Sequence, residues 1–158
     1  MKNCRLFLLL IYFIASPSWA GTFEELISGS TGNTYIVSTE SEFNERAASA
    51  KPGDVILVKD GTYSGWQLKI PSVGTKDKPI IYTAQHQGGV TFQNGMKLFW
   101  ISGSYNIIDG FNMLNVEDEV IRFHSGASHN RITNCNMDGL GSTSVSYTHL
   151  TLPTKRIV

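Results

Sequence analysis

The chain has 158 residues, a formal net charge of zero and 41% hydrophobic residues. That length leaves room for at most one domain of ordinary size. Residues 21–143 contain nine Lys/Arg and thirteen Asp/Glu, a net charge of about −4, which excludes the basic composition of a nucleic-acid-binding domain. We therefore expect no nucleic acid partner.

Residues 1–20 have the pattern of a secretory signal peptide. A basic start is followed by the apolar run LFLLLIYFIA, and small residues precede an expected cleavage between Ala20 and Gly21. The alternative is a membrane anchor, but the apolar run is too short and is closely followed by Pro17. We predict a secreted or periplasmic protein with no membrane association after the signal peptide is removed.

The segment TESEFNERAASA predicts one helix near the start of the mature chain. Thr39 or Ser41 could cap this helix, and Thr39 with Glu42 fits a capping box, which satisfies free N–H groups at a helix start. Phe43, Ala47 and Ala50 recur at helical spacing and would form one apolar face. The next four residues, KPGD, end the helix, because proline and glycine do not continue it.

From there on, short strand-like runs alternate with turn residues, which indicates an all-β architecture. Two internal matches define a period. LFWISG (98–103) aligns with IRFHSG (121–126) at an offset of 23, and YNIIDGFNM (105–113) aligns with HNRITNCNM (129–137) at 24. A period of this length with several short strands per repeat predicts a right-handed parallel β-helix, capped by the helix. Leucine-rich repeats and an immunoglobulin-like sandwich fit the pattern less well.

Stacked coils give the repeated asparagines a structural role. Asn106 aligns with Asn130, and Asn112 aligns with Asn136. Successive coils lie about 4.7–4.9 Å apart, so we expect each pair to form a ladder of side-chain amides. Asparagine also tolerates the left-handed backbone conformation that coil corners require.

The alignment at an offset of 23 also predicts which side chains face the core. Leu98 and Trp100 align with apolar residues of the next repeat and should point inward. Phe99 and Ile101 align with an arginine and a histidine and should point outward. Cys135 aligns with a phenylalanine, so we expect it to fill the core; after signal removal it is the only cysteine, which excludes an internal disulfide.

Motifs for common catalytic chemistries are missing from the sequence. His124 and His129 have poor spacing for a metal site and are expected at the surface or at corners. The acidic run 117–119 could bind Ca²⁺, although such runs are more often solvated. Arg122 could touch an anionic ligand from the outer face, or it could be an ordinary surface arginine. No residue is assigned a catalytic, metal-binding or substrate-binding role.

Residues 144–158 (containing VSYTHLTLPTKRIV) lose the repeat register and its Asn/Gly/Asp punctuation. They resemble translated sequencing adapter. We interpret them as a non-native tail joined to an incomplete gene, so residues 21–143 would be the first coils of a longer β-helix domain.

The stretch AKPGDVILVKDGTYSGWQLKIPSVGTKDKPIIYTAQHQGGVTF, together with ISGSYNIIDGFNM and HNRITNCNM further along, resembles the N-terminal part of polysaccharide lyase family 6. That family contains alginate lyases and chondroitinase B. The resemblance covers residues 38–140 and implies β-elimination on an anionic polysaccharide, most directly alginate, or dermatan or chondroitin sulfate.

The resemblance also implies that Ca²⁺ neutralises the uronate carboxylate of the substrate, while a lysine removes the C5 proton and an arginine assists the leaving oxygen. No position up to Gly141 matches those family motifs, so we expect the catalytic residues and the metal ligands further along the parent chain. A β-helix glycoside hydrolase, or a carbohydrate-binding β-helix without catalysis, would share this N-terminal region.

Overall fold

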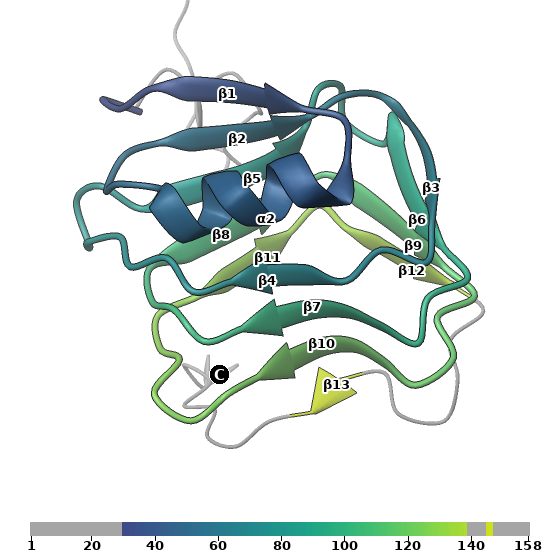
Figure 1. The fold of residues 1–158 in the computed structure, drawn as a ribbon. Helices are drawn as coiled ribbons and strands as arrows, with labels where there is room; N and C mark the ends of the chain where they lie inside the picture. Colours follow the sequence, from purple (N-terminus) through teal and green to yellow (C-terminus); the bar gives the residue numbers. More distant parts are fainter. Residues whose placement is uncertain (1–29, 139–144, 147–158) are drawn as a thin grey trace, which may run out of the picture.

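The computed structural model describes residues 30–138 and 145–146 (Figure 1). In this part the chain winds into a right-handed solenoid of about four coils, and strands of successive coils pair in parallel. The predicted parallel β-helix is therefore confirmed. No helix among these residues is long and apolar enough to cross a membrane. The predicted signal peptide and its cleavage between Ala20 and Gly21 lie outside the described residues.

Three parallel sheets run along the solenoid axis (Figure 1). The first, at the back in Figure 1, contains β1 (Thr34–Val37), β2 (Val55–Val58), β5 (Ile80–Ala84), β8 (Asn106–Asp109) and β11 (Arg131–Thr133). The second, at the right, contains β3 (Gly61–Ser64), β6 (Val90–Gln93), β9 (Phe111–Leu114) and β12 (Asn136–Asp138). The third, at the front, contains β4 (Leu68–Ile70), β7 (Lys97–Ile101), β10 (Glu119–Phe123) and β13 (Val145–Ser146).

The helix α2 (Glu40–Ser49) lies within the first coil, as the sequence predicts (Figure 1). Thr39 Oγ1 accepts a hydrogen bond from Glu42 N at 3.2 Å, and the Glu42 carboxylate accepts one from Thr39 N at 3.2 Å. This reciprocal pair is the expected capping box. Phe43 and Ala47 are fully buried, which confirms the predicted apolar face.

The helix also protects the free edge of the third sheet. Asn44 on α2 accepts a hydrogen bond from Lys69 N at 2.8 Å, and its Nδ2 donates to Gln67 O at 3.1 Å. These are backbone groups at β4, the outermost strand of that sheet. An edge strand presents unpaired N–H and C=O groups to further strands. Asn44 therefore takes the place that another coil would occupy.

Apolar columns fill the interior, because residues of successive coils lie above one another. Phe92 and Phe111 approach with ring centroids 5.3 Å apart, and Phe99 of the facing sheet lies 6.0 Å from each ring. On the first sheet the inward column continues through Ile56, Tyr82 and Ile108, which are paired in register and fully buried. The stacked core therefore joins all three sheets.

The predicted faces of β7 are wrong at three positions. Trp100 is partly exposed, whereas Phe99 and Ile101 are fully buried. The cause is the register: Phe99 pairs with Ile121 and Ile101 with Phe123, an offset of 22 and not 23. A slip of one residue exchanges the two faces of a strand.

The sequence offset between paired residues returns to 24 at the next corner, where Ser104 pairs with Ser128. The loop after β10 therefore contains two more residues than the loop after β7. The sequence alignment placed only one there. The shared Ser-Gly of the two loops favoured the wrong alignment.

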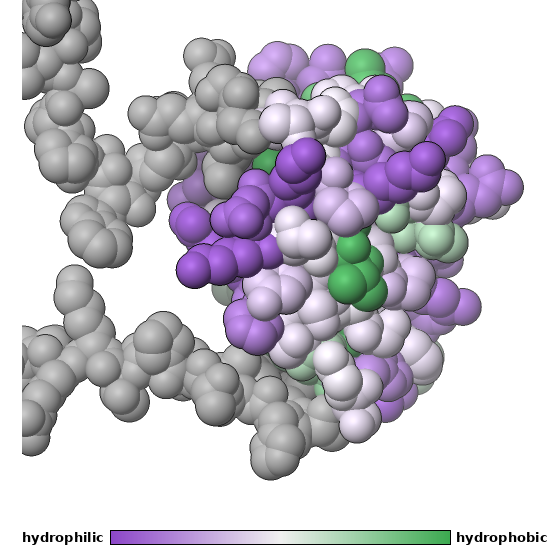
Figure 2. Space-filling view, turned by 90° about the vertical axis from the view of Figure 1, so that its left-hand side faces the viewer, coloured by the Kyte–Doolittle hydropathy of each residue, from purple (hydrophilic) through white to green (hydrophobic). Residues whose placement is uncertain are grey.

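The outer surface visible in Figure 2 is largely hydrophilic, and its hydrophobic residues form small separate spots. Among the described residues, the exposed large hydrophobic side chains are Ile36, Val73 and Met96. They lie far apart in the sequence and on different loops or strands.

Residues 144–158 are described only at β13, where Val145 pairs with Ile121 and Ser146 with Arg122. The rest of this segment lies outside the described residues. Its interpretation as a non-native tail, and the division at residue 143, stay predictions.

Candidate functional site

One of the two predicted asparagine pairs forms a buried hydrogen-bonded stack. Asn106 is fully buried, and its Nδ2 donates to Asn130 Oδ1 and to Ser72 O, each at 3.0 Å. Ser72 Oγ donates to Asn106 Oδ1 at 2.8 Å and lies 2.6 Å from the Tyr82 hydroxyl. Both ends of the Asn106 amide are satisfied inside the protein, so this network is structural and is not a ligand site.

The other pair is arranged differently. Asn112 and Asn136 are in register on β9 and β12, but they point away from the core and are at least partly exposed. Asn112 Nδ2 donates to Gly88 O of the preceding coil at 2.8 Å. Within the described range no amide-to-amide hydrogen bond joins this second pair, so the expected ladder is present at only one of the two positions.

Another asparagine of the repeat, Asn134, marks a corner. Asn134 has φ +51°, and Gly110, one coil earlier, has φ +78°. Asn134 Nδ2 donates to Asp109 Oδ1 at 2.7 Å, which fixes the corner to β8. Asparagine therefore occupies a left-handed position that glycine fills in the preceding coil.

The two histidines of interest lie in separate environments. His129 stacks on Tyr105 with ring centroids 4.5 Å apart and an interplanar angle of 8°. His124 instead contacts Trp100, at 5.2 Å between ring centroids. The residues in 30–138 contain no group of three His, Cys, Asp or Glu positioned to hold a metal ion.

The acidic run 117–119 is largely paired with cations. Lys97 Nζ lies 3.5 Å from Asp118 Oδ2. Arg122 Nη2 donates to Glu119 Oε1 at 2.6 Å, and Arg122 Nε lies 2.5 Å from Glu119 Oε2. The hydrogen bond that Arg122 donates to Glu119 also raises the pKa of Arg122 above its ordinary value. These carboxylates hold basic side chains in place.

Cys135 packs against the core beneath Ile108, as the alignment predicts. Burial raises the pKa of its thiol to about 11. A thiol with so high a pKa is protonated at neutral pH and is a poor nucleophile. Cys135 is therefore a packing residue.

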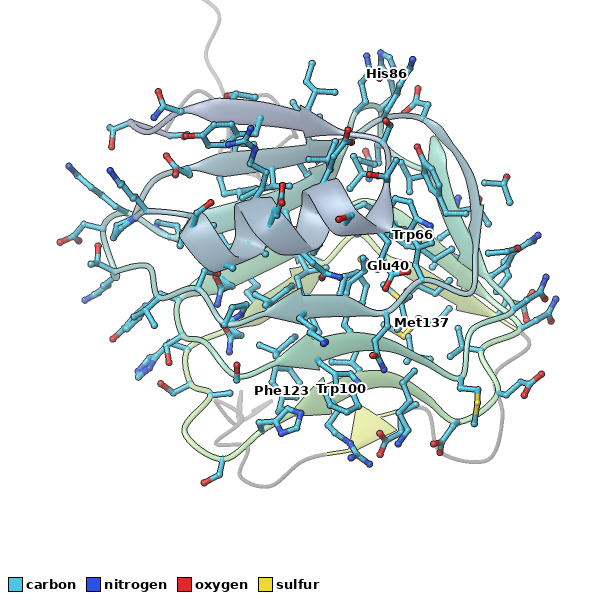
Figure 3. All side chains as sticks on the ribbon, in the orientation of Figure 1. Glu40, Trp66, His86, Trp100, Phe123 and Met137 are labelled. Atoms are coloured by element: carbon cyan, nitrogen blue, oxygen red, sulfur yellow. The ribbon has the colours of Figure 1, made fainter. Side chains whose placement is uncertain are left out.

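Asp60 and His86 brace the corner between the first and second sheets (Figure 3). His86 N donates to Asp60 Oδ1 at 3.1 Å, and His86 Nδ1 lies 2.5 Å from Asp60 Oδ2. The hydrogen bond from His86 lowers the pKa of Asp60. A Cβ on Gly89 would lie 2.4 Å from Asp60 Oδ1, so only glycine leaves room for this brace.

The outer face of the third sheet carries the strongest candidate for ligand contact. Lys69, Trp100 and Arg122 follow one another in register across β4, β7 and β10. Lys97 and Arg122 both lie over the indole ring, with their charged groups 5.8 Å from its centroid. Trp100 points outward from the front sheet in Figure 3. We call Lys69, Lys97, Trp100, Arg122 and His124 the Trp100 face.

Two ring nitrogens of the Trp100 face lack hydrogen-bond partners. Trp100 Nε1 and His124 Nε2 are both covered from solvent and form no hydrogen bond to any described residue. A buried polar group without a partner costs about 1–3 kcal/mol. The Trp100 face therefore combines three cations, a flat aromatic surface and two unsatisfied nitrogens.

Sequence reasoning identified Arg122 as a possible ligand contact and placed His124 on the outside, but it missed the rest of this face. The alignment error placed Trp100 in the core, and Lys69 lies in a coil that the internal repeat did not include. An alignment anchored on the buried pairs Phe99–Ile121 and Ile101–Phe123 would have found the column, because it keeps apolar residues opposite apolar residues.

Comparison with known proteins agrees with this architecture. The sequence profile of the Chondroitinase B family matches residues 37–155. No curated protein sequence matches the chain. Among solved structures, the family 6 alginate lyase AlyGC is 27% identical with a TM-score of 0.61, over 66% of this chain and 15% of that chain.

Two further structures share the fold at lower identity. A mannuronic-acid-specific family 6 lyase from human gut microbiota is 24% identical, with a TM-score of 0.63, over 68% of this chain and 27% of that one. The family 6 lyase Pedsa3628 from Pseudopedobacter saltans is 24% identical, with a TM-score of 0.58, over 65% of this chain and 24% of that chain. The chain thus spans about a quarter or less of the length of these relatives. By the match over residues 37–155, it belongs to the Chondroitinase B family.

Proposed function

We propose that this chain forms the first coils of a secreted lyase that cleaves uronate-containing polysaccharides by β-elimination. The observation that carries the proposal is the family match over residues 37–155. The alginate lyase with 27% identity supports alginate as the first substrate to test. Dermatan and chondroitin sulfate come next, because the matching family is named for chondroitinase B.

The reaction sets requirements for which the proposal assigns no described residue. The proton at C5 of a uronate becomes removable only when the neighbouring carboxylate is neutralised, and a base and an acid must then flank the scissile bond. Calcium would supply that neutralisation in the parent enzyme. Residues 30–138 offer no group of three potential ligands, so no residue here is assigned to the metal and no step is derived through it.

The described residues have a different task in this proposal. The helix α2 closes one end of the solenoid, and the stacked core fixes the three sheets. On this support the outer face of the third sheet presents Lys69, Trp100 and Arg122 along the axis. We assign the base, the acid and the metal ligands to further coils of the parent.

The test uses the protein expressed from the uninterrupted coding sequence of the parent. This protein is incubated with alginate, dermatan sulfate and chondroitin sulfate in the presence of Ca²⁺. Ultraviolet absorbance of the unsaturated uronate and release of reducing ends are measured together. We expect both to rise, because β-elimination creates a double bond at each cleavage. Reducing ends without the double bond would mean a glycoside hydrolase. Polymer retention with neither signal would mean a binding protein.

A further inference from the structure

The Trp100 face differs from the other outer faces of the solenoid. The outer face of the second sheet presents uncharged polar side chains in register, among them Thr62, Thr91 and Asn112. The Trp100 face instead places an indole within 5.8 Å of two cations and beside a histidine. An indole offers a flat apolar surface together with one N–H donor, which suits a ligand that is partly apolar and partly polar.

The cations of this face are held in fixed positions. Arg122 is 35% exposed and bound to a nearly buried Glu119, so its free edge faces outward while the carboxylate holds the guanidinium. Lys97 is 27% exposed and lies near Asp118. Lys69 is exposed and forms no ion pair with any residue in the described ranges. The face can therefore accept further negative charge at Lys69 and at the outward edge of Arg122.

The two unpartnered nitrogens indicate where an anionic oxygen would bind. Trp100 Nε1 is an obligatory donor, and His124 Nε2 is a donor in the appropriate tautomer or when protonated. The rings lie 5.2 Å apart, so one carboxylate could accept from both. Lys97 lies over the indole, and its ion pair with Asp118 is partly exposed. A rotation of this long side chain would open the indole N–H to a ligand while Arg122 stays on Glu119.

We propose that the Trp100 face is a binding surface for a uronate polysaccharide. Trp100 Nε1 and His124 Nε2 hold one carboxylate of the polysaccharide. The polysaccharide then runs along the solenoid axis between Lys69 and Arg122. These two cations are two strands apart, about 9–10 Å at ordinary strand spacing. The inference deepens the proposed function, on which it rests, by placing substrate contact on coils to which the proposal assigns no catalytic residue.

The experiment measures binding of the purified chain by electrophoresis in native gels containing a dissolved polymer. The polymers are alginate, dermatan sulfate, dextran sulfate and neutral dextran. We expect alginate to retard the chain and dextran to leave its mobility unchanged. Dextran sulfate carries charge without uronate, so it shows how much of the retardation is unspecific charge attraction.

The decisive variant is Trp100→Phe, which keeps an aromatic ring and removes the N–H donor. We expect alginate binding to weaken roughly ten- to a hundredfold, because a hydrogen bond to a charged acceptor is lost. Trp66→Phe is the matched control, since Trp66 packs on Tyr63 and Phe92 away from this face. Thermal unfolding of each variant establishes that the fold is intact.

Charge variants give an independent arm. Lys69→Gln should weaken alginate binding, whereas Arg131→Gln on the first sheet should not. Arg122 is left unchanged, because its loss would leave Glu119 buried without a partner.

Equal alginate affinity for the unchanged chain, Trp100→Phe and Lys69→Gln would overturn the proposal, as would the absence of any alginate retardation. Retardation by dextran sulfate alone would overturn it too. None of these results depends on the double-bond assay of the parent enzyme, so failure of this surface and failure of the lyase proposal are distinguishable.

Discussion

Asn106 shows how a single polar residue is accommodated inside an apolar solenoid. Its amide reaches backward to Ser72 and forward to Asn130, and so links three successive coils. Because the amide is fully buried, each of these hydrogen bonds replaces one that water would supply in the unfolded chain. The residue therefore helps to fix the corner between the third and first sheets.

Replacing Asn106 with alanine should lower the free energy of unfolding by about 2–3 kcal/mol, because Ser72 Oγ and Asn130 Oδ1 lose their partner in a buried site. Asn112→Ala is the matched control and should cost less than about 1 kcal/mol, since Asn112 is partly exposed and makes one bond to Gly88 O. Urea unfolding measures both. Equal losses would contradict a special role for the buried amide.

Cys135 gives a second test at the residue scale. Because burial raises its thiol pKa to about 11, the folded protein should react slowly with iodoacetamide at pH 8 and faster as the pH approaches 11. The assay uses a Cys4→Ser background, and the urea-unfolded chain is the control. Rapid labelling of the folded chain at pH 8 would show that the thiol is accessible and ionised.

At the scale of single elements, the helix and the third sheet show what the sequence can and cannot predict. The boundaries of α2 depend on a local signal, since Thr39 and Glu42 are only three residues apart. The register of β7 and β10 depends on how many residues the intervening loops contain. A local pattern does not determine loop length, so the helix was predicted correctly and the faces of β7 were not.

The corrected register predicts opposite tolerance at neighbouring positions of β7. Phe99→Ala should cost about 3–5 kcal/mol in the free energy of unfolding, because the ring is fully buried among Phe92 and Phe111. Trp100→Ala should cost less than half of that, since the indole lies on the outer face. Urea unfolding of the two variants is the measurement. A larger loss for Trp100→Ala than for Phe99→Ala would favour the alignment at an offset of 23 over the register seen in the structure.

Two acidic side chains at element ends should make stability depend on pH. The pKa of Glu42 is lowered by hydrogen bonds from the backbone of Ser38 and Thr39, and that of Asp60 by its hydrogen bond with His86. Their ordinary values are 4.5 and 3.8. A lowered folded-state pKa stabilises the protein above the ordinary value, and this stabilisation is lost as pH falls through the folded-state pKa.

Thermal unfolding between pH 6 and pH 3 should therefore show a falling Tm in the unchanged chain. The double variant Glu42→Gln and Asp60→Asn should show a weaker decline over the same range. Parallel curves would mean that other carboxyl groups cause the acid sensitivity.

At the scale of the whole molecule, stacking explains both the fold and the position of the candidate site. The coils after the first repeat the same three strands, so a 24-residue match was enough to predict a parallel β-helix. The Trp100 face could not be predicted in the same way, because its members are different residue types in each coil. Only three-dimensional register brings Lys69, Trp100 and Arg122 together.

The central claim is that these coils support and bind a polysaccharide, while the groups that break it lie on further coils of the parent. The direct measurement is double-bond absorbance when the purified 158-residue chain is incubated with alginate or dermatan sulfate and Ca²⁺. A boiled sample of the same chain serves as the control. We predict no rise above that control, because the described residues offer neither a metal-binding group nor an assigned base. A clear rise would contradict the account and place the catalytic residues within this chain.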